Sequence, residues 1–326
     1  MTTSNNPVMF IFPGQGSQYR GIGSDLYAKY DAAKKVYATA NEELGYDIAD
    51  ISFNDPDDIL NLTRYTQPAV LTHSVACLEV FKELTEGKVQ AAAAAGHSLG
   101  EYTALITAGA LSFENALQLV KRRGELMGEH GEGEMLAFPL DLETTRPLAE
   151  KFYCGVAGCN LKDQTVVGGR NDDLDAISKA VEELYPRKRA VRLKTEGAFH
   201  TYYMVKAAQH YRSELDKAQF DTPTIPVQSN YTGDFHDTDT ETIKSRLFLQ
   251  LFHPVMWYAN LQSTAAAGYS NFIEFGGGIG SGKTPEEKRP NLQSMVIKAF
   301  RGGEVKPTYN AVINANTLED TVAALS

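Results

Sequence analysis

Cysteine is scarce in this sequence, which excludes a protein held together by disulfide bonds. Only Cys77, Cys154 and Cys159 occur among 326 residues, they cannot all pair, and their spacing matches no zinc motif. We interpret them as reduced packing residues, which is typical of a cytoplasmic protein, and we expect that location.

Long apolar runs and an excess of positive charge are also missing. No apolar segment approaches the roughly 20 residues that cross a bilayer, so no membrane contact is expected. The opening MTTSNNPVMFIF lacks the basic start and long apolar core of a secretion signal. The net charge of −10 argues against nucleic-acid binding, because that function needs a basic surface. The hydrophobic fraction of 43% is that of an ordinary globular protein.

One local cluster, RKRAVRLK at 187–194, departs from this acidic average. Its cations either protect a solvated edge strand from pairing with other sheets or form a docking patch for an acidic partner. The sequence leaves both interpretations open.

The order of apolar runs and amphipathic segments predicts an α/β fold with an inserted α+β unit. VMFIF (8–12) has the composition of a buried strand, and the segment 66–87 has apolar residues at helical spacing. From 134 onward the order becomes strand, helix, strand, strand, helix, strand, which is the ferredoxin-like pattern. We therefore predict a small subdomain at 134–199, inserted into a large α/β subdomain made of 1–133 and 200–326.

GHSLG at 96–100 has the G-x-S-x-G pattern of a nucleophile elbow. In such an elbow a strand turns abruptly into a helix, and glycines remove the Cβ atoms that would collide in the turn. Ser98 would stand at the apex, and the N–H of Leu99 would be one donor to a developing oxyanion. Because an apolar run precedes the motif and a helical segment follows it, the context favours a nucleophile over a simple tight turn.

A serine hydroxyl needs a base, and seven histidines compete for this role. His97 is adjacent to Ser98, so its side chain should point away from the hydroxyl. His200 lies where the small subdomain returns to the large one, and clefts form at such junctions, which favours it modestly. Solvated or structural roles suit His73, which lies within a helix, and His130, His210 and His236, which lie in polar surroundings.

EFGGGIGSGKT at 274–284 raises a different possibility, because it contains the phosphate-loop pattern G-x-x-x-x-G-K-[ST]. A working phosphate loop leads directly into a helix. Here Pro285 and Pro290 interrupt the residues that follow, and only about 40 residues remain for the strands and the magnesium-binding aspartate of such a fold. We therefore favour a flexible glycine turn over a cleft.

Several motifs together resemble the malonyl-CoA:acyl carrier protein transacylases. This family includes the acyltransferase domains of fatty acid and polyketide synthases, especially the freestanding acyltransferases that serve polyketide synthases in trans. FPGQGSQ, TQPA, GHSLGEY, KRRGELM, GAFHTYYM and HPVMW occur in the family's order and spacing over nearly the whole chain. The resemblance implies an α/β-hydrolase-like core with an inserted ferredoxin-like subdomain, in agreement with the layout above. The chain departs from the family at GGGIGSGKT, where GPG and apolar residues are usual.

The resemblance also implies catalytic roles. Ser98 would carry the acyl group and His200 would be its base. The backbone N–H groups of Gln15 and Leu99 would form the oxyanion hole. The backbone carbonyl of Gln250 would orient the histidine, so that no acidic third member of a triad is needed.

Further residues would select the substrate. Arg123 matches the arginine that grips the malonyl carboxylate, a task that suits a planar guanidinium; without the resemblance it would be read as solvated surface. Phe199 matches the bulky residue of malonyl-specific members, so we expect malonyl to be preferred over methylmalonyl. Asn160 and Gln164 match a polar segment that lines the family's cleft, although Lys162 stands where a proline is usual.

The implied reaction moves a malonyl group from coenzyme A, through a seryl ester, to the phosphopantetheine thiol of an acyl carrier protein in fatty acid or polyketide biosynthesis. No metal or redox cofactor is implied. Carrier proteins are acidic, which would give the 187–194 cluster a purpose, and Lys283 is a further possible contact for the phosphates.

Three alternatives stay open. The first is an acyl hydrolase of the same fold, which would gain nothing from Arg123 if its acyl chains were uncharged. The second is a transferase for an unusual acyl group. The third is an inactive scaffold that binds carrier proteins, which the combination of Ser98, His200 and Arg123 disfavours.

Overall fold

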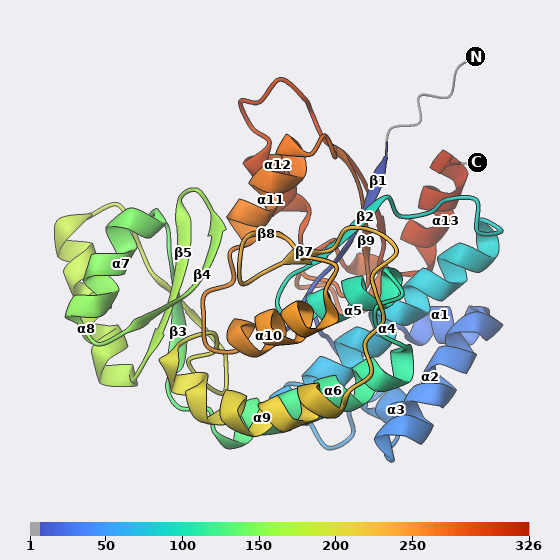
Figure 1. Cartoon of the computed structure of the whole chain (residues 1–326), viewed down its shortest axis with the longest axis horizontal. Coiled ribbons are helices and arrows are strands. Elements are labelled where there is room, and N and C mark those ends of the chain that lie inside the picture. Colours follow the sequence, from blue (N-terminus) through green and yellow to red (C-terminus); the bar gives the residue numbers. More distant parts are fainter. Residues whose placement is uncertain (1–6, 326) are drawn as a thin grey trace.

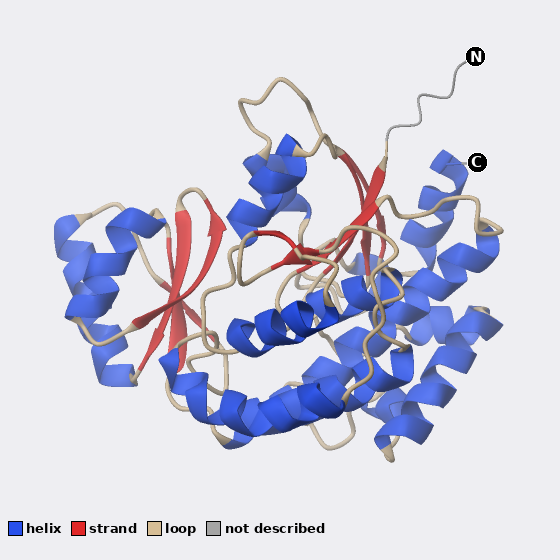
Figure 2. Cartoon of the chain, in the orientation of Figure 1, coloured by secondary structure: helices blue, strands red, loops and turns tan. Residues whose placement is uncertain are grey.

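A parallel sheet forms the centre of the larger of two units (Figures 1 and 2). Within residues 7–325, which the computed structural model describes, its strands lie in the order β10-β9-β1-β2. They are β1 (Val8–Phe12), β2 (Ala93–Gly96), β9 (Asn271–Phe275) and β10 (Thr308–Val312). The register places Met9 beside Ala93 on one side and Phe272 on the other. The strand predicted at 8–12 is therefore central in the sheet.

Helices cover both faces of this sheet, which explains why β1 is apolar without alternation. Phe10 and Phe12 pack into the core on the side of α4, whereas Met9 and Ile11 pack with residues of α11 and α12 on the other side. The helices of this unit are α1 (Ser24–Lys29), α2 (Asp31–Leu44), α3 (Ile48–Phe53), α4 (Thr63–Leu84), α5 (Gly100–Thr107), α6 (Phe113–Glu129), α9 (Val205–Lys217), α10 (Thr240–Gln250), α11 (Trp257–Ala266), α12 (Gln293–Ala299) and α13 (Ala315–Leu325), with the 3₁₀ turns η1 (Tyr202–Met204) and η2 (Pro285–Glu287).

The smaller unit is an antiparallel sheet with two helices packed beside it, at the left of Figure 1. Its strands lie in the order β4-β5-β3-β6, which is the ferredoxin-like arrangement. The elements are β3 (Glu134–Phe138), α7 (Leu142–Lys151), β4 (Gly155–Leu161), β5 (Gln164–Gly169), α8 (Asn171–Leu184) and β6 (Val191–Leu193). The predicted fold class, an α/β core with an inserted α+β unit, is confirmed. The boundaries at 134 and 199 stay a prediction.

The basic cluster at 187–194 contains β6, an edge strand of the small sheet. Arg192 forms ion pairs with Glu134 and Asp175. This charge is therefore partly neutralised by the chain itself, in agreement with the edge-strand interpretation.

Short strands differ most from the sequence prediction. The segment IPVQSN (225–230) also has the apolar start of a strand, but only β7 (Gln228–Ser229) forms there, and it pairs with β8 (Asp234–Phe235). Its polar side chains turn into the interior, where Gln228 bonds to Thr264 and Asn260. Strand β10 was not predicted at all. No helix within residues 7–325 combines the length and apolar character needed to cross a membrane, and residues 1–6, half of the segment inspected for a secretion signal, lie outside the described residues.

Candidate active site

Ser98 stands in a sharp turn between β2 and α5. β2 ends at Gly96, α5 begins at Gly100, and Ser98 has a φ of +53°, in the left-handed region. A Cβ atom on Gly96 would lie 1.8 Å from the carbonyl carbon of Gly100, and one on Gly100 would lie 2.2 Å from the carbonyl oxygen of Phe12. No side chain fits at either glycine, so the turn depends on both of them.

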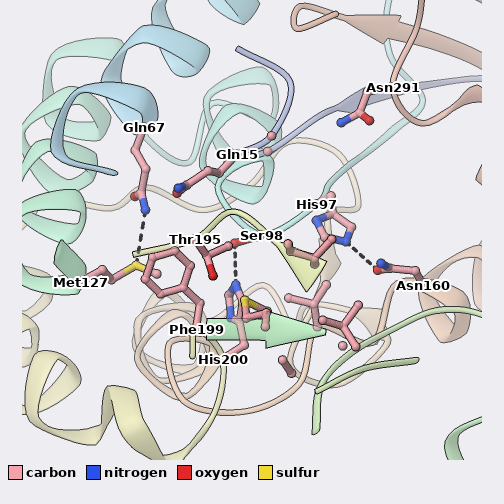
Figure 3. A pocket seen from close by; sticks show the side chains of 18 of the residues that line it. Gln15, Gln67, His97, Ser98, Met127, Asn160, Thr195, Phe199, His200 and Asn291 are labelled. Atoms are coloured by element: carbon pink, nitrogen blue, oxygen red, sulfur yellow. Dashed lines mark hydrogen bonds between the residues drawn. The ribbon is translucent and has the colours of Figure 1, made fainter. Parts of the chain in front are cut away.

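The hydroxyl of Ser98 faces the imidazole of His200 (Figure 3). Oγ lies 2.7 Å from Nε2, and Nδ1 lies 2.6 Å from the backbone carbonyl oxygen of Gln250. Since a carbonyl only accepts, Nδ1 carries the proton and Nε2 accepts from the hydroxyl. Burial, followed by the charge of Arg123, lowers the pKa of His200 to about 3. The ring is therefore neutral near pH 7 and able to take a proton.

Arg123 extends from α6 toward the same hydroxyl, although it is only 1% exposed. Its Nη2 donates to Ser98 Oγ at 3.2 Å and to Gln250 Oε1 at 3.0 Å, and its Nη1 donates to Gln67 Oε1 at 2.8 Å. Among the described residues these partners are all neutral, and Nε has none. A buried cation without an anion is unfavourable, so a carboxylate of a bound molecule would be stabilised beside this guanidinium.

The position of Arg123 depends on close packing between α6 and α4. A Cβ atom on Gly124 would lie 2.8 Å from the carbonyl oxygen of Thr63. Only glycine lets the two helices approach this far, and this approach brings the neighbouring Arg123 beside Gln67 of α4.

The backbone N–H groups of Gln15 and Leu99 belong to the two segments that meet at the elbow. Among the hydrogen bonds of residues 7–325, neither the amide of Gln15 nor that of Leu99 acts as a donor. The loop that carries Gln15 lies against the elbow, because a Cβ atom on Gly14 would be 2.4 Å from the carbonyl oxygen of His97. Unoccupied amides beside a nucleophile are the donors that a tetrahedral oxyanion requires.

A cavity of about 310 Å³ is lined by Gln15, Ser98, Arg123 and His200, and residues of both units contribute to it. Met135, Val166 and Leu193 of the small sheet line one part of it, and Phe199 lines it next to His200. The wall is thus partly apolar, with the polar groups gathered around Ser98.

The two polar residues predicted for the cleft are placed differently. Asn160 lines the cavity, and its Oδ1 lies 2.8 Å from Nε2 of His97, which points away from the Ser98 hydroxyl as expected (Figure 3). Gln164 is not part of the lining. It begins β5 one side-chain repeat, about 7 Å, before Val166, which does line the cavity. The strand thus carries Gln164 past the end of the cavity.

The segment that resembles a phosphate loop is filled by the chain itself. The amides of Lys283 and Thr284 donate to Glu287 Oε2 at 2.6 and 3.2 Å, and the following helical turn, η2, is only three residues long. A phosphate would need those amides, so the nucleotide interpretation is contradicted. Residues 276–290 are also absent from the cavity lining, so the expected glycine turn does not cover the cleft; Asn291 and Leu292 directly after it do line the cavity.

Several polar residues of the site were not predicted. Glu101, 0% exposed, accepts hydrogen bonds from the backbone of Asn230 and the side chain of Gln250. The only sequence signal was the glutamate of GHSLGEY, three residues after the serine. Asn291 follows the glycine segment at 274–284, and no sequence motif indicated that it would line the cavity. No cluster of three or more His, Cys, Asp or Glu side chains suited to a metal ion occurs within residues 7–325.

Comparisons with known proteins place the chain among acyl transferases. The family described as "Acyl transferase domain" matches residues 9–276. A malonyl CoA-acyl carrier protein transacylase from Bacillus subtilis is 37% identical over 280 residues, which cover 83% of this chain and 87% of the relative. A second relative from the same organism, a polyketide biosynthesis malonyl CoA-acyl carrier protein transacylase, is 35% identical over 83% of this chain and 93% of its own.

Solved structures give the same result for the fold. The malonyl CoA-acyl carrier protein transacylase from Clostridium perfringens superposes with a TM-score of 0.86 at 30% identity, over 98% of this chain and 97% of the other. A malonyl-transacylase in complex with a type II polyketide synthase acyl-carrier protein gives a TM-score of 0.85 at 28% identity, over 98% of this chain and 99% of the other.

Proposed function

This chain belongs to the acyl transferase domain family, and on that premise we propose that it acts as a malonyl-CoA:acyl carrier protein transacylase. It moves a malonyl group from coenzyme A to an acyl carrier protein in fatty acid or polyketide biosynthesis. The observation that carries the assignment of the acyl group is the buried guanidinium of Arg123, 3.2 Å from the Ser98 hydroxyl and without a carboxylate partner in the described chain.

The first half-reaction acylates the serine. Nε2 of His200 takes the proton of Ser98 as Oγ attacks the thioester carbonyl carbon, and the oxyanion accepts from the amides of Gln15 and Leu99. The carbon–sulfur bond then breaks, and His200 returns the proton to the sulfur of coenzyme A. The malonyl carboxylate is held by Arg123 throughout, which keeps the carbonyl carbon beside Oγ.

The second half-reaction reverses these steps with a different thiol. His200 takes the proton of the phosphopantetheine thiol, the sulfur attacks the seryl ester, and the carbon–oxygen bond breaks as Ser98 regains a proton. The backbone carbonyl of Gln250 keeps Nδ1 protonated in both halves. These steps use only side chains, amides and the two thiols, so the mechanism contains no cofactor.

Substrate binding itself should activate the base. The charge of Arg123 contributes to the lowered pKa of His200. A malonyl carboxylate beside the guanidinium neutralises that charge and removes this contribution, so the imidazole becomes more basic when the correct substrate is bound. An uncharged acyl group cannot do this.

Intact-mass analysis tests the proposal. Wild-type protein mixed with malonyl-CoA should gain one malonyl group, Ser98→Ala should gain none, and addition of phosphopantetheinylated carrier protein should transfer the group to the carrier. Release of free malonate with the carrier left unloaded would identify a hydrolase instead. Absence of any adduct on the wild type would support the scaffold alternative.

A further inference from the structure

A buried carboxylate behind the serine connects the elements that hold the site, and we infer that Glu101, kept in place by His236, is a positioning residue for Ser98 and Arg123. The inference rests on the proposed function and deepens it. Glu101 lies in the first turn of α5, three residues after Ser98, and is 0% exposed. It does not line the cavity, so any effect on the reaction passes through its partners.

The first connection runs to the backbone of the elbow. Oε2 of Glu101 accepts from the backbone N–H of Asn230 at 2.9 Å. The side chain of Asn230 in turn accepts from the N–H of Ser98 through Oδ1 and donates to the carbonyl oxygen of Gly96 at 2.8 Å. Ser98 has a strained φ of +53°, so a fixed partner for its N–H holds the hydroxyl in place.

The second connection runs to the guanidinium. Nε2 of Gln250 donates to the same Oε2 at 2.8 Å, which leaves its Oε1 facing Arg123 at 3.0 Å. A guanidinium only donates and a carboxylate only accepts, so Arg123 and Glu101 hold the two ends of this amide in one orientation, with Oε1 toward Arg123 and Nε2 toward Glu101. This amide lies between Glu101 and Arg123, so the two charged groups share a partner and Glu101 does not bond to the guanidinium directly.

His236 completes the surroundings of the carboxylate. Its Nε2 donates to Oε1 of Glu101 at 2.7 Å, and both side chains are almost fully buried, 1% and 0% exposed. Its Nδ1 has no partner among the described residues. The ring belongs to the segment after β8, and the N–H of His236 donates to the carbonyl oxygen of Val227. Loss of this donor leaves one buried carboxylate oxygen unsatisfied, and Glu101 then competes for other donors.

The experiment compares His236→Leu, which removes the donor, with His236→Gln, which returns an N–H close to the position of Nε2. Glu101→Gln is the second variant, since it keeps the shape and removes the charge. His73→Leu is the matched control: this histidine is also 0% exposed, but its ring bonds to Ile313 and Cys77, away from the site. Acylation by malonyl-CoA and by acetyl-CoA is followed by quenched-flow intact mass, with melting temperatures recorded alongside.

We expect His236→Leu and Glu101→Gln to slow malonyl acylation about ten- to a hundredfold, the range of one buried charged hydrogen bond. The malonyl-to-acetyl ratio should fall as well, because Arg123 loses its fixed partner. His236→Gln should recover most of the rate and the ratio, and His73→Leu should keep the wild-type ratio at a lower melting temperature.

Three results would overturn the inference: wild-type rates in His236→Leu and Glu101→Gln, an unchanged ratio with losses that only follow the melting temperature, or no recovery in His236→Gln. Failure of the proposed function gives a different pattern, since the wild type would then form no malonyl adduct. In that case, labelling of Ser98 by a fluorophosphonate still reports on the position of the hydroxyl, and it should be slower in His236→Leu than in the wild type.

Discussion

Arg123 is buried, and within residues 7–325 its positive charge bonds only to neutral groups, which is uncommon for an arginine. The sequence alone placed it in a basic helical stretch, where most arginines are solvated. Only the close approach of α6 to α4 at Gly124 takes it into the interior. The position of the buried positive charge therefore depends on the packing at Gly124 as much as on Arg123 itself.

Replacement of Arg123 by alanine should lower kcat/KM for malonyl-CoA by about a hundredfold or more, because two charged hydrogen bonds to the carboxylate are lost. Acetyl-CoA, which has no carboxylate, should lose much less. Arg123→Lys should lie between, since an ammonium keeps the charge without the planar pair of donors. Steady-state kinetics with both thioesters measure this, and equal losses for the two substrates would contradict a carboxylate-binding role.

Phe199 is expected to exclude branched acyl groups. Its ring is 5% exposed and faces the cavity next to His200 (Figure 3). Phe199→Ser should raise kcat/KM for methylmalonyl-CoA relative to malonyl-CoA by about tenfold, the usual value of space for one methyl group. Competition between the two thioesters, read by the mass of the adduct, tests this. Wild-type protein that turns both over equally would show that the ring sets no such limit.

At the scale of elements, the sequence predicted the long, regular helices and strands, and it was least accurate for short or polar strands. The apolar run of β1, the helical spacing of α4 and the strand–helix order from 134 onward all extend over many residues, so a local pattern identifies them. β7 and β10 do not, because one turns amides into a buried network and the other is a half-buried edge strand of mixed composition.

The residues of the candidate site also fall into those that a local motif predicts and those that it does not. Ser98, Leu99 and Gln15 belong to glycine-framed motifs, so their neighbourhood could be anticipated from the sequence. Glu101 and Asn230 contact each other across more than a hundred residues. Such contacts depend on the register of the sheet and on the packing of α5, which no local pattern contains.

The glycine segment after β9 has the sequence pattern of a phosphate loop, but its structure is not that of a phosphate-binding site. Its amides at Lys283 and Thr284 are occupied by Glu287, and the side chain of Lys283 is exposed. We expect Lys283→Ala to leave kcat/KM for malonyl-CoA within about twofold of the wild type, as is usual for a surface substitution. Isothermal titration with ATP should show no binding. A large kinetic loss would indicate that Lys283 contacts the phosphates of coenzyme A.

For the whole molecule, the free energy of unfolding depends on pH through buried histidines. Burial lowers the pKa of His73 to about 4, and burial with Arg123 lowers that of His200 to about 3, against 6.5 for the free side chain. The unfolded chain therefore binds these protons below about pH 6.5, whereas the folded chain does not until much lower pH. The stability from these neutral rings is complete above pH 6.5 and is lost as the pH falls toward 4.

Removal of one of these rings should flatten this dependence. Between pH 6.5 and 4.5 the free energy of unfolding of His73→Leu should fall less than that of the wild type, by up to about 2 kcal/mol, since one proton contributes about 1.4 kcal/mol per pH unit. Urea unfolding at both pH values measures the difference. Parallel curves for the two proteins would show that His73 does not contribute.

The left-handed backbone at Ser98, with φ of +53°, has a counterpart at His200, with φ of +59°. Both halves of the reactive pair are thus held in conformations that the free chain avoids. We expect the pair to depend on the intact fold, because a loss of the surrounding packing would let both residues relax to more usual φ values and would separate the hydroxyl from the imidazole.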